Sequence, residues 1–178
     1  PEIGLVVSEG KRNKLSRSNL LIDLAQIPGI YVPSLYEVGL DGTTIESIHP
    51  SAPKAILRRV ATPLPQYGMG LIPNIETIHD RLKVEIRRGC TRGCRFCQPG
   101  MLTRPARDVE PNEIIDAVKQ GLNKTGYSDL SLLSLSCSDY LALPAVGTEI
   151  RNQLADQEIT LQLPSQRVDR FDNNIANI

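Results

Sequence analysis

The stretch KVEIRRGCTRGCRFC, residues 83–97, joins a short strand pattern to a loop that holds three of the chain's four cysteines. Val84 and Ile86 alternate with charged residues, as they do in a strand that buries one face. Gly89 and Gly93 let the loop turn tightly enough for the sulfurs to approach one another. The clustered cysteines are Cys90, Cys94 and Cys97. Three thiols this close together predict a metal centre.

From residue 80 onward, strand and helix patterns alternate. The predicted elements are a strand at 83–88, a helix at 111–124, a strand at 130–136, a helix at 143–154, a strand at 159–163 and a helix that starts near Phe171. Short connections in this order predict an α/β fold of parallel βαβ units. A complete eight-stranded barrel takes about 250 residues. We therefore expect residues 80–178 to form the N-terminal half of a truncated (β/α) barrel, with the cysteine loop at the carboxyl end of its first strand.

The first 79 residues predict a connecting α+β segment instead. Its predicted elements are an apolar run at 3–7, a polar loop at 10–14, a helix at 18–26, a hairpin at 36–48 and a third strand at 55–61. Ser18 or Asn19 can cap the helix. Asp41-Gly42 is a strong signal for a two-residue turn between hairpin strands 36–40 and 43–48. Residues 63–79 are rich in Pro and Gly, which predicts a linker.

Composition excludes several classes of protein. Twenty basic and twenty acidic residues balance, so the whole chain has no charge signature for nucleic acid or membrane. No apolar run reaches the roughly 18–20 residues of a spanning helix, and the start shows no signal-peptide pattern. Clustered thiols without a secretion signal predict a cytoplasmic protein. The chain begins with Pro1 rather than Met, which indicates a fragment or a processed chain.

Two kinds of metal centre fit the cysteines. Three ligands leave one coordination position open, which is typical of catalytic rather than structural sites. Structural zinc usually takes four ligands, and Cys137 is the one further cysteine. Iron–sulfur clusters bind clustered thiolates readily, so the spacing favours iron–sulfur while zinc stays open. We expect Cys137 to be a small strand residue.

The cysteine spacing also resembles a known family. Cys90-x3-Cys94-x2-Cys97, with Phe96 before the last cysteine and a strand directly in front, resembles the signature of the radical S-adenosylmethionine superfamily. Residues 84–105 resemble, more narrowly, bacterial members that carry a cobalamin-binding-type domain upstream. Three further stretches resemble the same group: LSLS and SDY at 133–140, LPS and RVD at 163–169, and IPGIYVP at 27–33.

The resemblance implies a set of roles. The three cysteines would bind a 4Fe-4S cluster, whose open iron would take the amino and carboxylate groups of S-adenosylmethionine, and Phe96 would lie against the adenine. One electron, from a donor of the flavodoxin or ferredoxin type, would cleave the cofactor to methionine and a 5′-deoxyadenosyl radical. The substrate stays unassigned, as do the catalytic residues. Cobalamin, and with it methyl transfer, would require a domain outside this chain.

The end of the second predicted strand departs from the family pattern. Where that family often has Gly-Gly-Glu to hold the cofactor's amino group, this chain has Ser136, Cys137, Ser138 and Asp139. The serines and the aspartate can accept hydrogen bonds from an ammonium, or can be ordinary turn residues. Arg167 and Asp169 follow the third strand, where each can contact a cofactor or substrate, or form a surface ion pair.

The segment 81–108 holds eight Arg or Lys and two acidic residues. Such a basic rim can bind the carboxylate of S-adenosylmethionine, an anionic substrate or RNA, although it lacks the interleaved aromatics of a nucleic-acid platform. The same residues also fit a solvated, salt-bridged rim. Two alternative functions remain: a non-catalytic zinc-binding interaction module, and an RNA-modifying enzyme of the methylthiotransferase type, which would need a further cluster.

Overall fold

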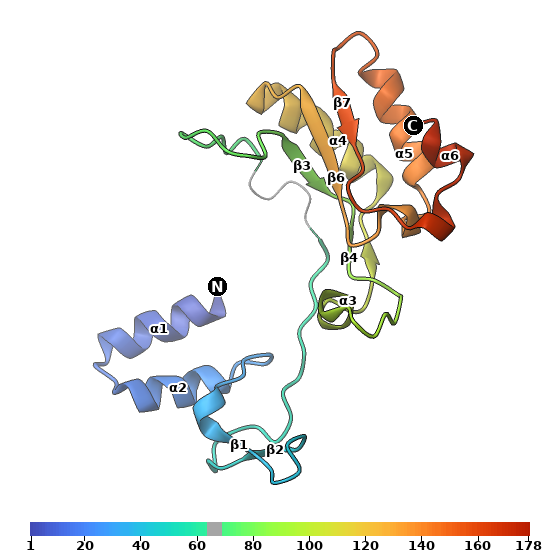
Figure 1. The fold of residues 1–178 in the computed structure, drawn as a ribbon. Coiled ribbons are helices and arrows are strands. Elements are labelled where there is room, and N and C mark those ends of the chain that lie inside the picture. The colour runs from blue at the N-terminus through green and yellow to red at the C-terminus, as the bar shows by residue number, and fades with distance from the viewer. Residues whose placement is uncertain (64–68) are drawn as a thin grey trace. The chain divides into compact units, whose positions relative to one another are not determined.

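The computed structural model describes residues 1–63 and 69–178, which divide into two compact units, residues 1–61 and 62–178 (Figure 1). Residues 64–68 of the predicted linker, including Pro65 and Gly68, lie outside the described residues. Each unit has its own cluster of buried apolar side chains. In the described part of the chain, no helix has both the length and the apolar character needed to cross a membrane.

The first unit contains two helices and a hairpin. Its elements are α1 (Glu2–Arg12), α2 (Arg17–Ala25), the 3-10 helix η1 (Pro33–Leu35), β1 (Tyr36–Val38) and β2 (Ile45–Ser47). Its core consists of Ala25, Val32, Leu35 and Ala52. No strand forms at 55–61, so that prediction is wrong, and within this described unit β2 pairs with β1. The apolar residues Leu57 and Val60 of that segment are exposed.

Both helices of this unit differ from the prediction at one end. Residues 10–12 belong to α1 rather than to a loop. Gly10 lies where α2 approaches closely, since a Cβ there would lie 2.6 Å from Leu20 Cδ1. Helix α2 begins at Arg17, since Ser16 is its N-cap and the Ser16 Oγ accepts a hydrogen bond of 3.3 Å from the Asn19 N–H. Neither Ser18 nor Asn19 caps it.

The predicted hairpin is confirmed, but its turn is longer than two residues. Strands β1 and β2 pair antiparallel from Tyr36 opposite Ser47 to Val38 opposite Ile45, so residues 39–44 form the connection. The Asp41 carboxylate accepts hydrogen bonds from the N–H groups of Thr43 at 3.0 Å and Thr44 at 2.9 Å. An aspartate that satisfies two backbone donors stabilises this longer loop.

The second unit is an α/β fold, as predicted. Its elements are β3 (Leu82–Glu85), β4 (Arg87–Arg88), α3 (Gln98–Leu102), β5 (Arg107–Asp108), α4 (Pro111–Thr125), β6 (Asp129–Leu133), η2 (Cys137–Asp139), α5 (Leu143–Gln153), β7 (Thr160–Gln162), η3 (Val168–Arg170) and α6 (Asn173–Ala176). Strands β3, β6 and β7 form a parallel sheet in the order β3-β6-β7. The sheet is open in the described residues (Figure 1).

The predicted strand 83–88 is in fact two strands. Strand β3 pairs parallel with β6, whereas β4 turns away and pairs antiparallel with β5. Ile86 lies between them: its N–H donates to Leu133 O at 3.0 Å, and its carbonyl accepts from the Val109 N–H at 3.0 Å. One residue therefore links the sheet to the small β4–β5 ladder.

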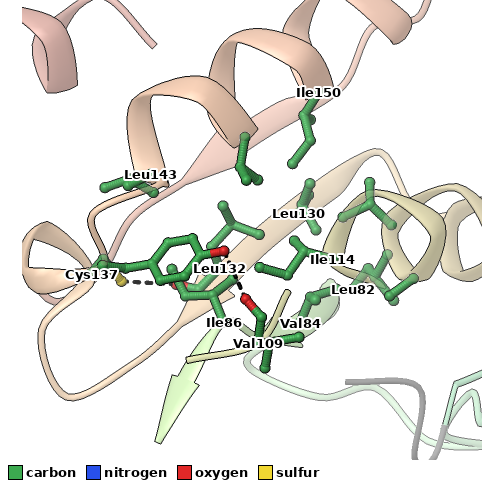
Figure 2. Close-up of a cluster of buried hydrophobic side chains, with 14 of the residues drawn as sticks. Leu82, Val84, Ile86, Val109, Ile114, Leu130, Leu132, Cys137, Leu143 and Ile150 are labelled. Carbon is green, nitrogen blue, oxygen red and sulfur yellow. Dashed lines mark hydrogen bonds between the residues drawn. The ribbon is translucent and has the colours of Figure 1, made fainter. Parts of the chain in front are cut away.

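A core of buried apolar side chains lies between the sheet and the helices (Figure 2). The fully buried side chains include Val84, Ile86, Leu130, Leu132, Ile114 and Leu143. Burying a side chain of this size stabilises the fold by about 1.5–3 kcal/mol. The Tyr140 hydroxyl lies within this core and donates to Val109 O at 2.8 Å, and burial raises its pKa to about 12. This core fixes the carboxyl ends of β3 and β6 beside each other.

Candidate functional site

The cysteine loop, which we define as residues 89–106, leaves and re-enters the fold through β4 and β5. Its base is held by a salt bridge of 2.5 Å between Arg87 Nη1 and Asp108 Oδ1. The Arg87 side chain is 9% exposed, so this ion pair is partly shielded from water. The parallel strands β3, β6 and β7 end at the same sheet edge, and the loop continues from β3 through β4 beyond that edge (Figure 1).

Gly89 closes the loop at its base. Its φ of +86° lies in the left-handed region, and a Cβ there would lie 2.5 Å from Thr103 O and 2.7 Å from Pro105 O. A side chain would therefore collide with the returning backbone. Across the loop, Arg104 Nη2 donates to Arg92 O at 2.7 Å. Arg104 thus joins the outgoing and returning halves of the loop.

The three clustered cysteines lie on the outgoing half. Cys90 and Cys97 are half-buried and Cys94 is exposed. The Cys97 N–H donates to Cys94 O at 3.0 Å, which turns the chain between the second and third cysteines. A Cβ on Gly100 would lie 3.2 Å from Cys97 Sγ and 3.9 Å from Cys90 Cβ. The first and third cysteines therefore both lie close to Gly100, where a side chain would crowd the Cys97 sulfur.

The thiols do not form a closed site for a single ion. Among the residues that the structure describes, no group of three or more His, Cys, Asp or Glu side chains is placed to hold a metal ion. Phe96, expected to face an adenine, is 92% exposed. The loop therefore presents Cys94 and the aromatic ring of Phe96 at the surface.

The segments after β6 and β7 lie side by side at the same sheet edge. The Cys137 N–H donates to Ser165 O at 2.7 Å, and the Arg167 N–H donates to Ser138 Oγ at 3.0 Å. Arg167 Nη1 binds Asp139 Oδ1 at 2.8 Å, and its Nη2 binds the Asp169 carboxylate. The predicted ion pair of Arg167 thus exists. Arg167 joins the segment after β7 to Ser138 and Asp139 in the segment after β6.

Several buried polar atoms in these segments have no hydrogen-bond partner within the described structure. They are Ser136 Oγ, Asp139 Oδ2, and both Nε2 and Oε1 of Gln166. Ser136 is 3% exposed and the Asp139 side chain 9% exposed, so both are largely shielded from bulk solvent. A buried polar group without a partner costs about 1–3 kcal/mol. Such a cost is offset when a polar ligand supplies the missing hydrogen bonds.

Gln166 is a candidate that the sequence did not reveal. It lies between Ser165 and Arg167 after β7, and no periodicity or motif distinguishes it from the chain's other glutamines. Its position beside Arg167, a predicted site residue, was the one available signal. The structure adds Gln166 to the set formed by Ser136, Ser138, Asp139 and Arg167.

Cys137 is separate from the other cysteines. It is fully buried in the core, in η2 rather than in the strand, which ends at Leu133. Its Sγ donates to Leu132 O at 3.2 Å (Figure 2), and burial raises the pKa of the thiol. A protonated, hydrogen-bonded thiol packs as a small core residue.

Comparisons with known proteins give a limited result. No family model matches the chain. Over 95 residues, 53% of this chain, it is 26% identical to the uncharacterized protein MJ0966 of Methanocaldococcus jannaschii. The matched region covers 20% of that protein, about a fifth of its relative's length. The name of this relative states no activity.

Proposed function

We propose that this chain is part of a radical S-adenosylmethionine enzyme, with the cysteine loop as its 4Fe-4S site. The observation that carries the proposal is a loop with three thiols that follows β3 through β4, in a unit whose segments after β6 and β7 hold buried polar atoms without partners among the described residues. When bound, the cluster would supply the electron that cleaves S-adenosylmethionine and starts radical chemistry. The substrate remains open, as does a link to cobalamin through a domain outside the chain.

The residues of the loop fit a cluster. Thiolates are the usual ligands of iron–sulfur clusters, and an acid-free loop supplies no competing carboxylate ligand. Gly100 leaves room beside Cys97 Sγ and Cys90, which any larger side chain would fill. Cys90, Cys94 and Cys97 would hold the iron, while Gly89 and Arg104 would hold the loop.

The residues after β6 and β7 fit the amino-acid end of S-adenosylmethionine. Asp139 Oδ2 and Ser136 Oγ can accept hydrogen bonds from its ammonium group, while Arg167 fixes the other Asp139 oxygen. The Gln166 amide has both a donor and an acceptor to offer. Phe96 would turn from solvent onto the adenine. In this proposal the three parallel strands are the first strands of a partial (β/α) barrel.

Anaerobic reconstitution with ferrous iron and sulfide tests the metal site. We expect a brown protein with about four irons and four sulfides per chain. Replacing Cys90, Cys94 or Cys97 with Ala should reduce iron binding to near background. Cys137→Ala is the matched control and should keep the iron, because Cys137 is a core residue. A colourless protein that binds zinc and takes up no iron would instead establish the zinc-binding module.

Equilibrium dialysis with labelled S-adenosylmethionine tests the second half of the site. Asp139→Asn in the reconstituted protein should weaken binding about tenfold or more, since a hydrogen bond to a charged group contributes about 1.5–3 kcal/mol. Asp169→Asn is the matched control, because Asp169 also binds Arg167 but is 65% exposed. Equal affinity of the two variants for S-adenosylmethionine would show that Asp139 does not contact this cofactor.

A further inference from the structure

Strand β3 lies at one border of the parallel sheet. Among the residues that the structure describes, its one neighbour in that sheet is β6 (Figure 1). The described residues that precede β3 add no strand to the sheet, since β1 and β2 pair with each other. The border along β3 is therefore open to a strand from outside the preceding part of the chain.

The backbone along this border is oriented for pairing. The Ile86 N–H, directly after β3, donates to Leu133 O on β6 at 3.0 Å. Successive residues of a strand direct their backbone groups to opposite sides, so Lys83 and Glu85 direct theirs away from β6. The N–H and carbonyl groups of both residues thus line the outer border. Such a border is a template for a further strand.

The side chains along β3 are complementary to a reversed copy of themselves. From Leu82 to Ile86 the buried apolar residues alternate with Lys83 and Glu85, on either side of Val84. Lys83 is exposed and forms no salt bridge within the described structure, and the Glu85 side chain is 28% exposed. When two copies of β3 lie antiparallel about a twofold axis at Val84, each Lys83 lies opposite Glu85 of the other copy. The outward backbone groups of the same two residues then form the hydrogen bonds.

We propose that β3 is a self-association surface, through which two copies of this chain join their three-stranded sheets into one continuous sheet. The contact is isologous, because the same strand serves both copies. Opposite charges directly across an antiparallel pair stabilise it, and like charges destabilise it. A register shifted by two residues would place Lys83 opposite Lys83, or Glu85 opposite Glu85. The charges therefore select the pairing centred on Val84.

A second copy fits this border better than an unrelated extended peptide does. An unrelated peptide would need an acid opposite Lys83, a base opposite Glu85 and a residue between them that fits against Val84. The chain itself supplies that order. The pairing uses neither the cysteines nor a metal, so it is independent of the proposed function. It also leaves the opposite border, along β7, open for the later strands of the proposed partial barrel.

The test is a charge swap followed by sedimentation velocity of the full chain over a wide range of concentration. Lys83→Glu is compared with the double variant Lys83→Glu/Glu85→Lys, which restores opposite charges across the pair. Lys119→Glu is the matched control, because it makes the same charge change on an exposed residue of α4 that faces α5. Circular dichroism checks that each variant is folded. Amide hydrogen exchange at low and high concentration locates the contact.

We expect the native chain to form a reversible dimer, which Lys83→Glu weakens at least tenfold and Lys119→Glu leaves unchanged. The double variant should recover most of the native affinity. The amides of Lys83 and Glu85 should gain protection at high concentration, whereas that of Val84, which faces β6, should not change. A native chain that stays monomeric at every concentration would overturn the inference and leave the border to a strand of a longer polypeptide. A double variant that associates no better than Lys83→Glu would also overturn it.

Discussion

Two loops of this protein are each closed by a short antiparallel ladder, and they differ in how their polar groups are used. In the hairpin loop, residues 39–44, Asp41 binds the backbone and hydroxyl groups of Thr43 and Thr44. In the cysteine loop, Cys94 and two arginines are exposed, the Cys90 Sγ accepts from the Arg92 N–H at 3.4 Å, and Arg104 and the Gly89 backbone hold the shape. A loop that satisfies itself is structural, whereas one that keeps its reactive groups unpaired is suited to a ligand.

The two glycines with positive φ give the largest expected contrast between these loops. Gly89→Ala places a Cβ against backbone oxygens and should destabilise the β4–β5 ladder by about 2–4 kcal/mol. Gly42→Ala meets no atom within 4 Å, so it should cost about 1–2 kcal/mol from its left-handed φ alone. Amide hydrogen exchange at Val109 and Gly39 measures both effects. Equal destabilisation by the two substitutions would mean that the backbone at Thr103 and Pro105 can shift to accommodate the new Cβ at position 89.

The ion pairs at the base of the cysteine loop give the next contrast. Arg87→Ala removes a shielded partner of Asp108 and should lower thermal stability by about 1.5–3 kcal/mol. Arg88→Ala breaks an exposed pair with Glu85 and should cost under about 1 kcal/mol. Thermal unfolding followed by circular dichroism compares the two. A larger effect for Arg88 would show that β4 presents its other face to the fold.

Removing the cross-loop contact should loosen the cysteine loop without unfolding the sheet. Arg104→Ala removes the hydrogen bond to Arg92 O, a contribution of about 1.5–3 kcal/mol to the closed loop. We expect alkylation of the half-buried Cys97 to speed up several-fold, and that of the exposed Cys94 to change little. Mass spectrometry of the labelled peptides reads both rates. Uniform acceleration, including Cys137, would indicate global unfolding instead.

The smallest expected effect is the pH response of the hairpin loop. Hydrogen bonds, first of all from the Thr44 side chain and backbone, hold the pKa of Asp41 well below its ordinary value of 3.8. A lowered folded-state pKa means that this contribution is complete above about pH 4 and is lost as pH falls below that value. Carboxyl chemical shifts from an NMR titration test this directly. An Asp41 that titrates at its ordinary pKa would show that the loop is open in solution.

Local signals in the sequence predicted the α/β unit well. Helix α4 spans Pro111–Thr125 against a prediction of 111–124, because Pro suits the first turn and Gly126 adopts the left-handed conformation that ends a helix. The strands of the sheet were found because buried apolar runs leave few alternatives. These features depend on residues close in sequence.

Errors arose where distant residues decide the structure. The break after Glu85 depends on pairing with Arg107 and Asp108, which no local pattern reveals. Gly10 was predicted in a loop, yet it lies within α1 and is buried against Leu20 of α2, a contact that the local sequence does not reveal. For the site, the spacing of the three cysteines identified them in the sequence. Gln166 was identified only from the structure, in which its buried amide atoms have no hydrogen-bond partner among the described residues.

The strand order β3-β6-β7 has a consequence for how this chain behaves among its own copies. Within the described residues, β6 is the central strand and β3 and β7 are the outer strands of the sheet. Outer strands carry backbone donors and acceptors that can pair with any extended segment that reaches them. Further strands, whether from a longer polypeptide or from a neighbouring molecule, would extend the sheet along these two borders. Solutions of the chain are therefore best studied dilute, with light scattering as a check on self-association.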